Sequence, residues 1–397
     1  MPLKLFEEMV NDPYYKERLE EKKKKMQPIK VVVIGVGGAG VNTIKRLATM
    51  GVKKATLVAI NTDIQHLVQL ENELELLREQ NPEVNDVIIL PIGEETTEGK
   101  GAGGDPAIAA RAAYESQKDI ERVVQDADLV FITCGEGGGT GTGAAPVVAK
   151  IAKEVTIKRR GEGKEALVIS IVTFPFSHEG RVKKAMMGIK ALAQYSDTVL
   201  VIENDKLVEV AGNLPVELAF RAADELIATI IKNLTETINE PSVVNIDFND
   251  VSVVMKMGGI ALIGVGESDS KSNRAIESIH NALTNRMMDV EIKQAKGALV
   301  HFSIGDDISL AELNMAIHEL RKYLNEDAEI FFGARIDPKL KGMIRSMVII
   351  SGVENPYITD EELGDFKSGD DKIEKYFSMR NKEKAEKFNP LITFEEL

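Results

Sequence analysis

The sequence predicts an α/β protein with a Rossmann-like parallel-sheet domain, a long central helix and a smaller second α/β domain. Short apolar runs alternate with helical patterns between residues 29 and 205. That alternation is typical of a parallel sheet covered by helices on both faces. Apolar residues then recur at helical spacing over 215–239, and a shorter alternation of apolar runs and helical patterns follows.

Six apolar runs in the first half predict six strands. In order they read IKVVVIG, TLVAI, VIIL, LVFIT, ALVISIVT and TVLVI. Fully apolar strands are expected where both faces of a sheet are buried. Four further runs predict the strands of the second half, VSVVMKM, ALVHF, EIFFGA and SMVIISG, with helices near 272–286 and 309–324.

These patterns divide the chain into five stretches. Residues 1–28 form a charged N-terminal extension, and residues 29–214 carry the first sheet. The central helix occupies 215–239, and the second α/β domain occupies 240–353. Residues 354–397 are polar and mixed in charge, which predicts a flexible tail that ends in the apolar motif FNPLITFEEL.

Composition excludes several classes of protein. A net charge of −14 argues against a partner that is a nucleic acid or an anionic membrane, because phosphate attraction needs a basic face. The single cysteine, Cys134, excludes a disulfide framework and fits a reducing compartment. No apolar run reaches the roughly 18 residues that a membrane span needs. We therefore expect a cytoplasmic protein with no direct membrane insertion.

The first glycine-rich turn follows the first predicted strand. Residues 35–40 read GVGGAG and open a helix, which makes a phosphate cradle from bare backbone and a helix N-terminus. A dinucleotide-binding dehydrogenase would place an acidic residue at the end of the second strand. Here that strand ends in Asn61, with Asp63 two residues later. By itself the motif also fits a tight turn that binds nothing.

Two more glycine clusters follow strands and precede helices. They are GEGGGTGTG at 135–143 and GKGAGGDP at 99–106. Because open α/β sheets bind ligands at the carboxyl edge, three such loops suit a ligand with several phosphates. Thr140 and Thr142 can add hydroxyl donors where glycine offers only N–H groups. The P-loop signature G-x-x-x-x-G-K-[ST] is absent, so the sequence predicts a triphosphate held mainly by backbone.

Eight motifs in order carry a family resemblance. They are GVGGAGVN, NTD, GAGG, GGGTGTGAAP, PFSHEGR, ENDKL, AFRAADE and NIDFNDV, spread over 29–353. Together they resemble the tubulin/FtsZ superfamily, and within it FtsZ, the prokaryotic cell-division GTPases, in a divergent archaeal form. The resemblance implies a GTP-binding domain, a central helix, a smaller activation domain and assembly into filaments.

The resemblance also implies the nucleotide contacts. Glu179 is expected to bind the ribose, with Lys183 near the nucleotide, and Asn204 and Asp224 to read guanine while Phe220 stacks on the base. An Asp carboxylate can accept from the N1–H and 2-amino groups of guanine, which adenine does not offer. The remaining expected contacts to GTP or GDP are Gly37, Gly38, Ala39, Gly40, Val41, Asn42, Asn61, Asp63, Gly101, Ala102, Gly103, Gly104, Gly137, Gly138, Gly139, Thr140, Gly141, Thr142 and Gly143.

The motif NIDFNDV resembles the family's catalytic loop, with Asn245, Asp247 and Asp250 as the catalytic residues. The 25 residues of the predicted central helix rise about 37 Å, which separates this loop from the guanine-reading residues. The loop can then act only on the γ-phosphate of a neighbouring subunit, beside a bound Mg²⁺ ion. Such a head-to-tail contact does not close and so propagates as a filament. Without the resemblance, the two Asp residues would be interpreted as helix caps.

Two residues depart from the family pattern. Lys183 replaces an Arg that the family usually has, which loses the planar guanidinium, although Arg181 is nearby. Glu136 occupies a position that is commonly apolar, and a charge there would repel phosphates or weaken a filament contact. These departures keep a second hypothesis open, a nucleotide-binding structural or regulatory paralogue that shapes the cell with little hydrolysis. A nicotinamide dehydrogenase built on the first glycine turn is the third.

The expected partners follow from the resemblance and from the tail. The protein would bind copies of itself head to tail, and it would reach a mid-cell ring if it acts in division. The terminal motif FNPLITFEEL would dock an apolar stripe into a membrane-adaptor protein, or else pack back onto the body of the protein.

Overall fold

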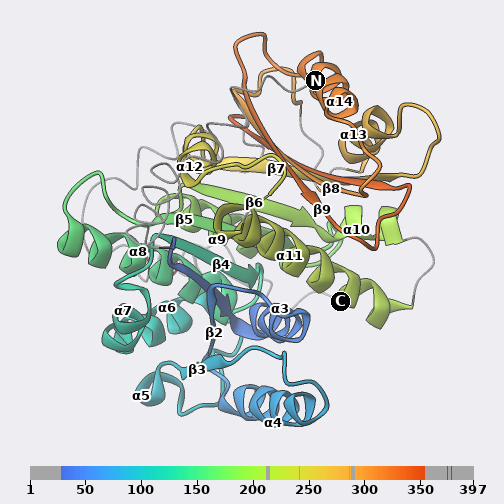
Figure 1. The fold of residues 1–397 in the computed structure, drawn as a ribbon. Coiled ribbons are helices and arrows are strands. Elements are labelled where there is room, and N and C mark those ends of the chain that lie inside the picture. The colour runs from blue at the N-terminus through green and yellow to red at the C-terminus, as the bar shows by residue number, and fades with distance from the viewer. Residues whose placement is uncertain are drawn as a thin grey trace, which may run out of the picture.

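The protein is built on one continuous sheet that helices cover on both faces (Figure 1). The computed structural model describes residues 28–211, 215–240, 242–285, 287, 291–353, 373 and 377. Over these residues the sheet has 10 strands in the order β3-β2-β1-β4-β5-β6-β7-β10-β8-β9.

The first six strands are parallel and form a Rossmann-like half. They are β1 (Val31–Val36), β2 (Ala55–Asn61), β3 (Val87–Pro91), β4 (Leu129–Gly135), β5 (Leu167–Phe174) and β6 (Thr198–Glu203). Chain order reverses between β1 and β4, which are neighbours in the sheet. In open α/β sheets this reversal point is where ligands bind, just beyond the carboxyl ends of the strands.

Two buried apolar clusters lie on opposite faces of this half. Helices α6 to α9 contribute to one cluster, and α3, α4 and α11 contribute to the other. The helices of the first half are α3 (Gly37–Met50), α4 (Ile64–Gln80), α5 (Glu94–Thr97), α6 (Pro106–Glu115), α7 (Gln117–Val124), α8 (Thr140–Arg160), α9 (Val182–Ala193) and α10 (Asn204–Ala211).

The predicted central helix is α11 (Val216–Asn239). Its 24 residues give a length of about 36 Å. Ile227, Ile230 and Leu234 recur at helical spacing and are buried against the sheet. Figure 1 shows α11 running across the molecule, with α12 near its C-terminal end.

The second half adds four strands to the same sheet. It comprises α12 (Phe248–Met255), β7 (Ile260–Ser268), α13 (Arg274–Thr284), β8 (Gly297–Ile304), α14 (Leu310–Arg321), β9 (Glu329–Ile336) and β10 (Ile344–Ser351). Strand β10 pairs antiparallel with β7 and β8, and β9 pairs parallel with β8. Only two residue pairs join β6 to β7, Val199 with Ile260 and Leu200 with Ala261. The two halves therefore share a sheet through a short seam.

One predicted strand is a helix. The run VSVVMKM was expected to be extended, but most of it lies in α12. Asp247 and Asp250 begin this helix with a reciprocal capping box, which satisfies backbone donors that a strand would leave to a neighbour. Val251 and Val254, three positions apart, are both buried. The strand of this region is instead β7, which the sequence analysis did not predict.

The predicted tail contains two buried side chains. Ile373 and Phe377 are each 1% exposed and belong to the larger apolar cluster. The prediction of a flexible tail does not hold at these two positions, because the chain packs against the body there. The N-terminal extension up to residue 27 and the terminal motif FNPLITFEEL lie outside the described residues.

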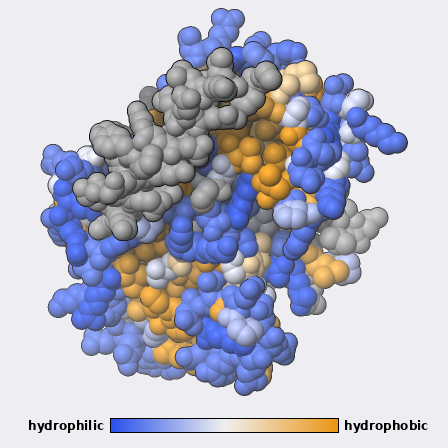
Figure 2. Space-filling model, in the orientation of Figure 1, coloured by the Kyte–Doolittle hydropathy of each residue, from blue (hydrophilic) through white to orange (hydrophobic). Residues whose placement is uncertain are grey.

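The face drawn in Figure 2 is largely hydrophilic, and its apolar side chains gather in separate areas. Among the described residues, no helix has the length and apolar character that crossing a bilayer requires.

Candidate functional site

A cavity of about 400 Å³ opens at the carboxyl ends of β1 and β4, where the chain order of the sheet reverses. Val36 and Gly135, which end these two strands, both line it. The predicted nucleotide contacts that line it are Gly38, Ala39, Asn42, Gly138, Gly139, Thr140, Gly141, Asn204, Phe220 and Asp224. Residues from four separate motifs of the sequence thus meet at one site.

Two helices begin at this cavity without a side-chain cap. Helix α3 follows Val36 and α8 follows Gly139, and neither N-cap residue accepts a hydrogen bond through its side chain. The first N–H groups of both helices are therefore available, and both helix dipoles place positive charge at the cavity. This arrangement is suited to bind phosphate groups.

The glycines of the loop 135–143 serve different purposes. Gly137 has a φ of +90°, which a side chain rarely adopts. A Cβ atom at Gly143 would lie 2.0 Å from the carbonyl oxygen of Pro106, so close packing of α8 on α6 requires glycine there. At Gly138 a Cβ would meet nothing within 4 Å, although the residue lines the cavity. Glycine at 138 thus leaves room that a ligand can fill.

The third glycine cluster packs directly on the second. A Cβ atom at Gly139 would lie 3.0 Å from the Cα of Gly104 and 3.1 Å from the Cβ of Ala102. The hydroxyls of Thr62 and Thr140 lie 2.7 Å apart, and the N–H of Gly101 donates to the carbonyl of Thr62. All three predicted loops therefore meet, although residues 101–104 are not among those that line the cavity.

Asn61 and Asp63 hold the local structure at the end of β2. Asp63 is the N-cap of α4 and accepts from the N–H groups of Gln65 and His66. The Nδ2 of Asn61 lies 3.2 Å from Nδ1 of His66. Both residues stay predicted nucleotide contacts, and neither lines the cavity.

Asp224 and Phe220 lie together at the N-terminal end of α11, where guanine is expected. Asp224 is half-buried, and burial raises its pKa to about 6 while a hydrogen bond from Thr43 and the charge of Lys45 oppose that rise. The Thr43 hydroxyl donates to Oδ1 at 3.3 Å. The Phe220 ring is 47% exposed, and its centroid lies 6.3 Å from that of Phe176. A carboxylate beside an open aromatic face can bind a purine through its edge and its plane.

An arginine lines the cavity near the expected ribose site. Arg181 is one of the lining residues and forms an ion pair with Glu179, whose carboxylate also accepts from the N–H of Phe176. Lys183 is exposed and is not among the lining residues. From the sequence, Arg181 was named only as a residue near Lys183 and was not predicted to contact the nucleotide. Its spacing of two residues from Glu179 was the available signal.

Glu136 lines the cavity, and its environment favours the neutral form of its carboxyl. It is 4% exposed, and burial raises its pKa to about 8 despite hydrogen bonds with Thr142 and Cys134. Its carboxyl group takes the space beside Gly188 of α9, where a Cβ atom would lie 1.9 Å from Oε2. Burial therefore favours the neutral carboxyl, which weakens the expected like-charge repulsion of phosphates near neutral pH.

The predicted catalytic residues lie beyond the other end of α11. Asp247 and Asp250 cap α12 through each other, since Oδ1 of Asp247 accepts from the N–H of Asp250 at 2.9 Å, and Oδ2 of Asp250 accepts from the N–H of Asp247 at 3.1 Å. The exposed Asn245 accepts from the N–H of Ser242 at 2.7 Å. None of the three lines the cavity. The interpretation as helix caps is correct, and it leaves one oxygen of each carboxylate outside the capping box.

Three residues that were not predicted from the sequence form hydrogen bonds to predicted site residues. Thr43 orients Asp224, Thr62 contacts Thr140, and Lys184 donates to the carbonyl of Gly104 at 2.5 Å. Thr43 and Thr62 directly follow predicted contacts in the sequence, which was the only signal available.

Within the ranges that the structure covers, no three His, Cys, Asp or Glu side chains form a cluster that could hold a metal ion.

Two family models match the chain. The Tubulin/FtsZ family, GTPase domain, matches residues 30–212, and the FtsZ family, C-terminal domain, matches residues 259–354. Cell division protein FtsZ 2 of Pyrococcus furiosus is 48% identical over 378 residues, which cover 92% of this chain and 89% of that protein. Cell division protein FtsZ 1 of the same organism is 46% identical over 347 residues, which cover 86% of this chain and 87% of that protein.

Solved structures are similar as well. A structure described as an empty FtsZ dimer of M. jannaschii matches with a TM-score of 0.74 and 43% identity, over 86% of this chain and 92% of that one. CetZ2 from Haloferax volcanii matches with a TM-score of 0.66 and 23% identity, over 90% of this chain and 99% of that one. The second likeness extends to the fold alone.

Proposed function

Since the chain belongs to the FtsZ family of tubulin-like GTPases, we propose that it hydrolyses GTP at the contact between two subunits stacked head to tail in a filament. Membership of the family confirms the resemblance found in the eight motifs and the predicted fold class. It makes the chain a GTP-binding cell-division protein. The division of the active site between subunits, and its activation by assembly, are the proposed part.

One observation carries the proposal. The cavity lies at the N-terminal end of α11, and Asp247 and Asp250 follow its C-terminal end. The helix is about 36 Å long, so no rotation of a side chain brings these carboxylates to the cavity of their own subunit. Residues 243–250, which lead into α12, are called the Asp loop. A second subunit that presents its Asp loop to this cavity would complete the site.

The nucleotide would lie along the cavity from phosphates to base. The N-termini of α3 and α8 would bind the phosphates, and Arg181 would approach the ribose and phosphate region. Asp224 would accept from the guanine edge while Phe220 covers the ring. Adenine lacks the N1–H and 2-amino donors that guanine offers to an ionised Asp224, which favours GTP over ATP.

The Asp loop of the next subunit would position the attacking water. Asp247 and Asp250 already hold each other in place, so the loop needs little reorganisation when it meets the phosphate. Bound Mg²⁺ would neutralise the charge that develops on the phosphate oxygens. Asn245 lies on the same exposed loop and would face the same contact.

Both ends of the subunit expose apolar side chains that such a contact would cover. Leu218 and Phe220 are 44% and 47% exposed at the cavity end, and Val243 and Val253 are 62% and 42% exposed at the loop end. Because the two surfaces differ, their contact is heterologous and does not close on itself. This supports growth into a filament, and self-association of a relative is recorded in the FtsZ dimer of M. jannaschii.

Asp250→Ala tests the division of the site. The variant should bind GTP as the wild type does and form filaments visible by electron microscopy, yet release at least about 100-fold less phosphate. Asp269→Ala changes another exposed aspartate of the second half and serves as the matched control. Loss of GTP binding in Asp250→Ala would refute the separated site. Undiminished phosphate release would refute the catalytic role.

The proposed function includes a role for the C-terminal motif in placing the protein in the cell. FNPLITFEEL would bind a membrane-adaptor protein and so bring filaments to a mid-cell ring. Removal of residues 388–397 should leave polymerisation and hydrolysis intact in solution but abolish the ring in cells. A ring that persists without these residues would refute this role of the motif.

A further inference from the structure

We infer that Arg335 is a positioning residue that fixes the Asp247–Asp250 loop against the end of the central helix. The inference deepens the proposed function and rests on it, since it concerns how the loop is presented to the next subunit. It begins from a second cavity, remote from the nucleotide site.

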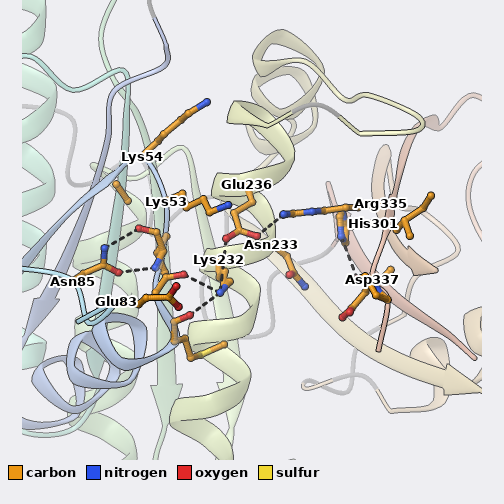
Figure 3. A pocket seen from close by; sticks show the side chains of 17 residues that line it. Lys53, Lys54, Glu83, Asn85, Lys232, Asn233, Glu236, His301, Arg335 and Asp337 are labelled. Atoms are coloured by element: carbon orange, nitrogen blue, oxygen red, sulfur yellow. Dashed lines mark hydrogen bonds and ion pairs between the residues drawn. The ribbon is translucent and has the colours of Figure 1, made fainter. Parts of the chain in front are cut away.

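This cavity, of about 740 Å³, lies between the C-terminal half of α11 and strand β9. Charged side chains of both signs line it, among them Lys53, Lys232, Glu236 and Arg335 (Figure 3). Figure 3 shows Arg335 reaching from the strand side to Glu236 on α11. Lys232 and Arg335 both pair with Glu236, so these charges form a network in the cavity wall.

Arg335 joins two carboxylates at the C-terminal end of α11, Glu236 in its last turn and Glu240 at its C-cap. One guanidinium nitrogen pairs with Glu236, and the other donates to Oε2 of Glu240 at 2.8 Å. The two glutamates are four positions apart in the sequence and both reach the same guanidinium group. Their side chains are only 8% and 15% exposed. Carboxylates with so little access to water need a cationic partner, and Arg335 supplies a forked one.

The residue next to Arg335 holds the start of the Asp loop. The carbonyl of Ala334 accepts from the N–H groups of Val243 and Val244 at 2.9 and 3.2 Å, and its own N–H donates to the carbonyl of Val244 at 3.0 Å. Ile246 packs on Gly333, where a Cβ atom would lie 2.9 Å from Ile246 Cδ1. The loop is thus attached to β9 immediately beside the arginine, and Asp247 follows Val244 by three residues.

Lysines tie the same end of α11 to the GTP-binding half. Lys54 donates to the carbonyl of Asn239 at 2.7 Å, and Lys53 lies 3.5 Å from Glu240. Lys232 donates to the carbonyls of Met50, the last residue of α3, and Gly51, its C-cap. Cations at the C-terminal end of α11 are also favoured by its dipole. Arg335 is the member of this network that comes from β9 and thereby fixes the strand that carries the loop.

The consequence is kinetic. If Arg335 is lost, β9 and the attached loop are no longer held to α11 at this point, while the nucleotide cavity at the far end is untouched. A displacement of about 1 Å in a positioned catalytic group can cost on the order of 100-fold in rate. We therefore expect loss of turnover in the filament without loss of GTP affinity.

The test uses the full-length protein with Arg335→Met, a variant of similar length without the charge. Phosphate release at saturating GTP should fall at least about tenfold, and the affinity of the monomer for GTP should not change. Arg335→Lys should restore part of the rate. Arg345→Met is the matched control, because Arg345 pairs with Glu267 between β10 and β7 and should leave turnover unchanged. Glu240→Gln, which weakens only the partner nearest the loop, provides a milder variant if Arg335→Met does not fold.

A mixing experiment shows where the defect lies. Asp224→Ala impairs the cavity and Asp250→Ala impairs the loop. Arg335→Met subunits should regain hydrolysis when mixed with Asp224→Ala, whose loop is intact, and should gain none when mixed with Asp250→Ala. The inference is overturned if Arg335→Met keeps the wild-type rate, if Glu240→Gln keeps it where Arg335→Met does not fold, or if Arg335→Met is rescued by Asp250→Ala. Full turnover in Asp250→Ala alone would instead refute the proposed function.

Discussion

Glu136 shows how a single buried group changes the properties of a phosphate-binding loop. Burial between α8 and α9 raises the pKa of its carboxyl to about 8, far above the ordinary value of 4.5. As pH rises, the unfolded chain therefore loses this proton well before the folded protein does. The folded state is destabilised progressively between about pH 4.5 and pH 8, and the loss is complete above pH 8.

Replacing this carboxyl tests that effect. Glu136→Gln keeps the shape and removes the ionisation, so it should be more stable than the wild type at pH 8 by up to about 4 kcal/mol, with little difference at pH 5. Urea denaturation at the two pH values measures the change. The exposed Glu162→Gln is the control and should show no such pH dependence. Equal stability of Glu136→Gln and the wild type at pH 8 would contradict the buried, protonated state.

Asp224 predicts a pH dependence of nucleotide binding. Its pKa is raised to about 6 by burial, with the hydrogen bond from Thr43 acting in the opposite direction. Only the carboxylate accepts from guanine, so GTP affinity should fall as the pH is lowered through 6. Thr43→Val removes the opposing hydrogen bond and should shift this fall to higher pH, whereas Thr43→Ser should not. Fluorescence titration with a labelled GTP measures it, and identical profiles for Thr43→Val and the wild type would exclude the positioning role.

For single residues, the sequence predicted well which motifs form the site. It predicted less well what the individual residues of those motifs do. Gly138, Thr140, Asp224 and Phe220 were predicted from motifs and line one cavity. Glu136 packs beside Gly188, 52 positions away, and no local pattern relates these two residues. Such effects require knowledge of which distant residues pack together.

The elements show the same division between local and distant causes. The six parallel strands and α11 follow from apolar patterns that are strong within their own segments. The run VSVVMKM also has strong β-propensity, but the capping box formed by Asp247 and Asp250 begins a helix there. Propensity is a weak guide when side chains outside the run fix the first turn.

The two roles of Asp247 can be separated at this scale. Asparagine is as good an N-cap as aspartate, so Asp247→Asn should leave the stability within about 0.5 kcal/mol while it lowers phosphate release strongly. Asp247→Ala loses both roles and should also cost about 1 kcal/mol of stability. Thermal unfolding and phosphate release measured on both variants decide the matter. Wild-type turnover in Asp247→Asn would show that only the cap is needed.

The whole molecule depends on contacts that the sequence did not indicate. The sequence predicted two α/β domains, and the structure joins their strands into one sheet through two residue pairs between β6 and β7. Arg335 and its glutamates add a second connection between the halves, across residues nearly a hundred positions apart. Pairings this short or this distant leave no periodic signal in the chain.

The arrangement of the whole subunit carries the central claim, that the GTP cavity and the Asp loop work only across a contact between two subunits. The most direct measurement is phosphate release per subunit as a function of protein concentration, with filament formation followed by light scattering in the same samples. The rate per subunit should be close to zero while the protein is monomeric and rise steeply where filaments appear. A constant rate per subunit down to fully monomeric protein would contradict the account.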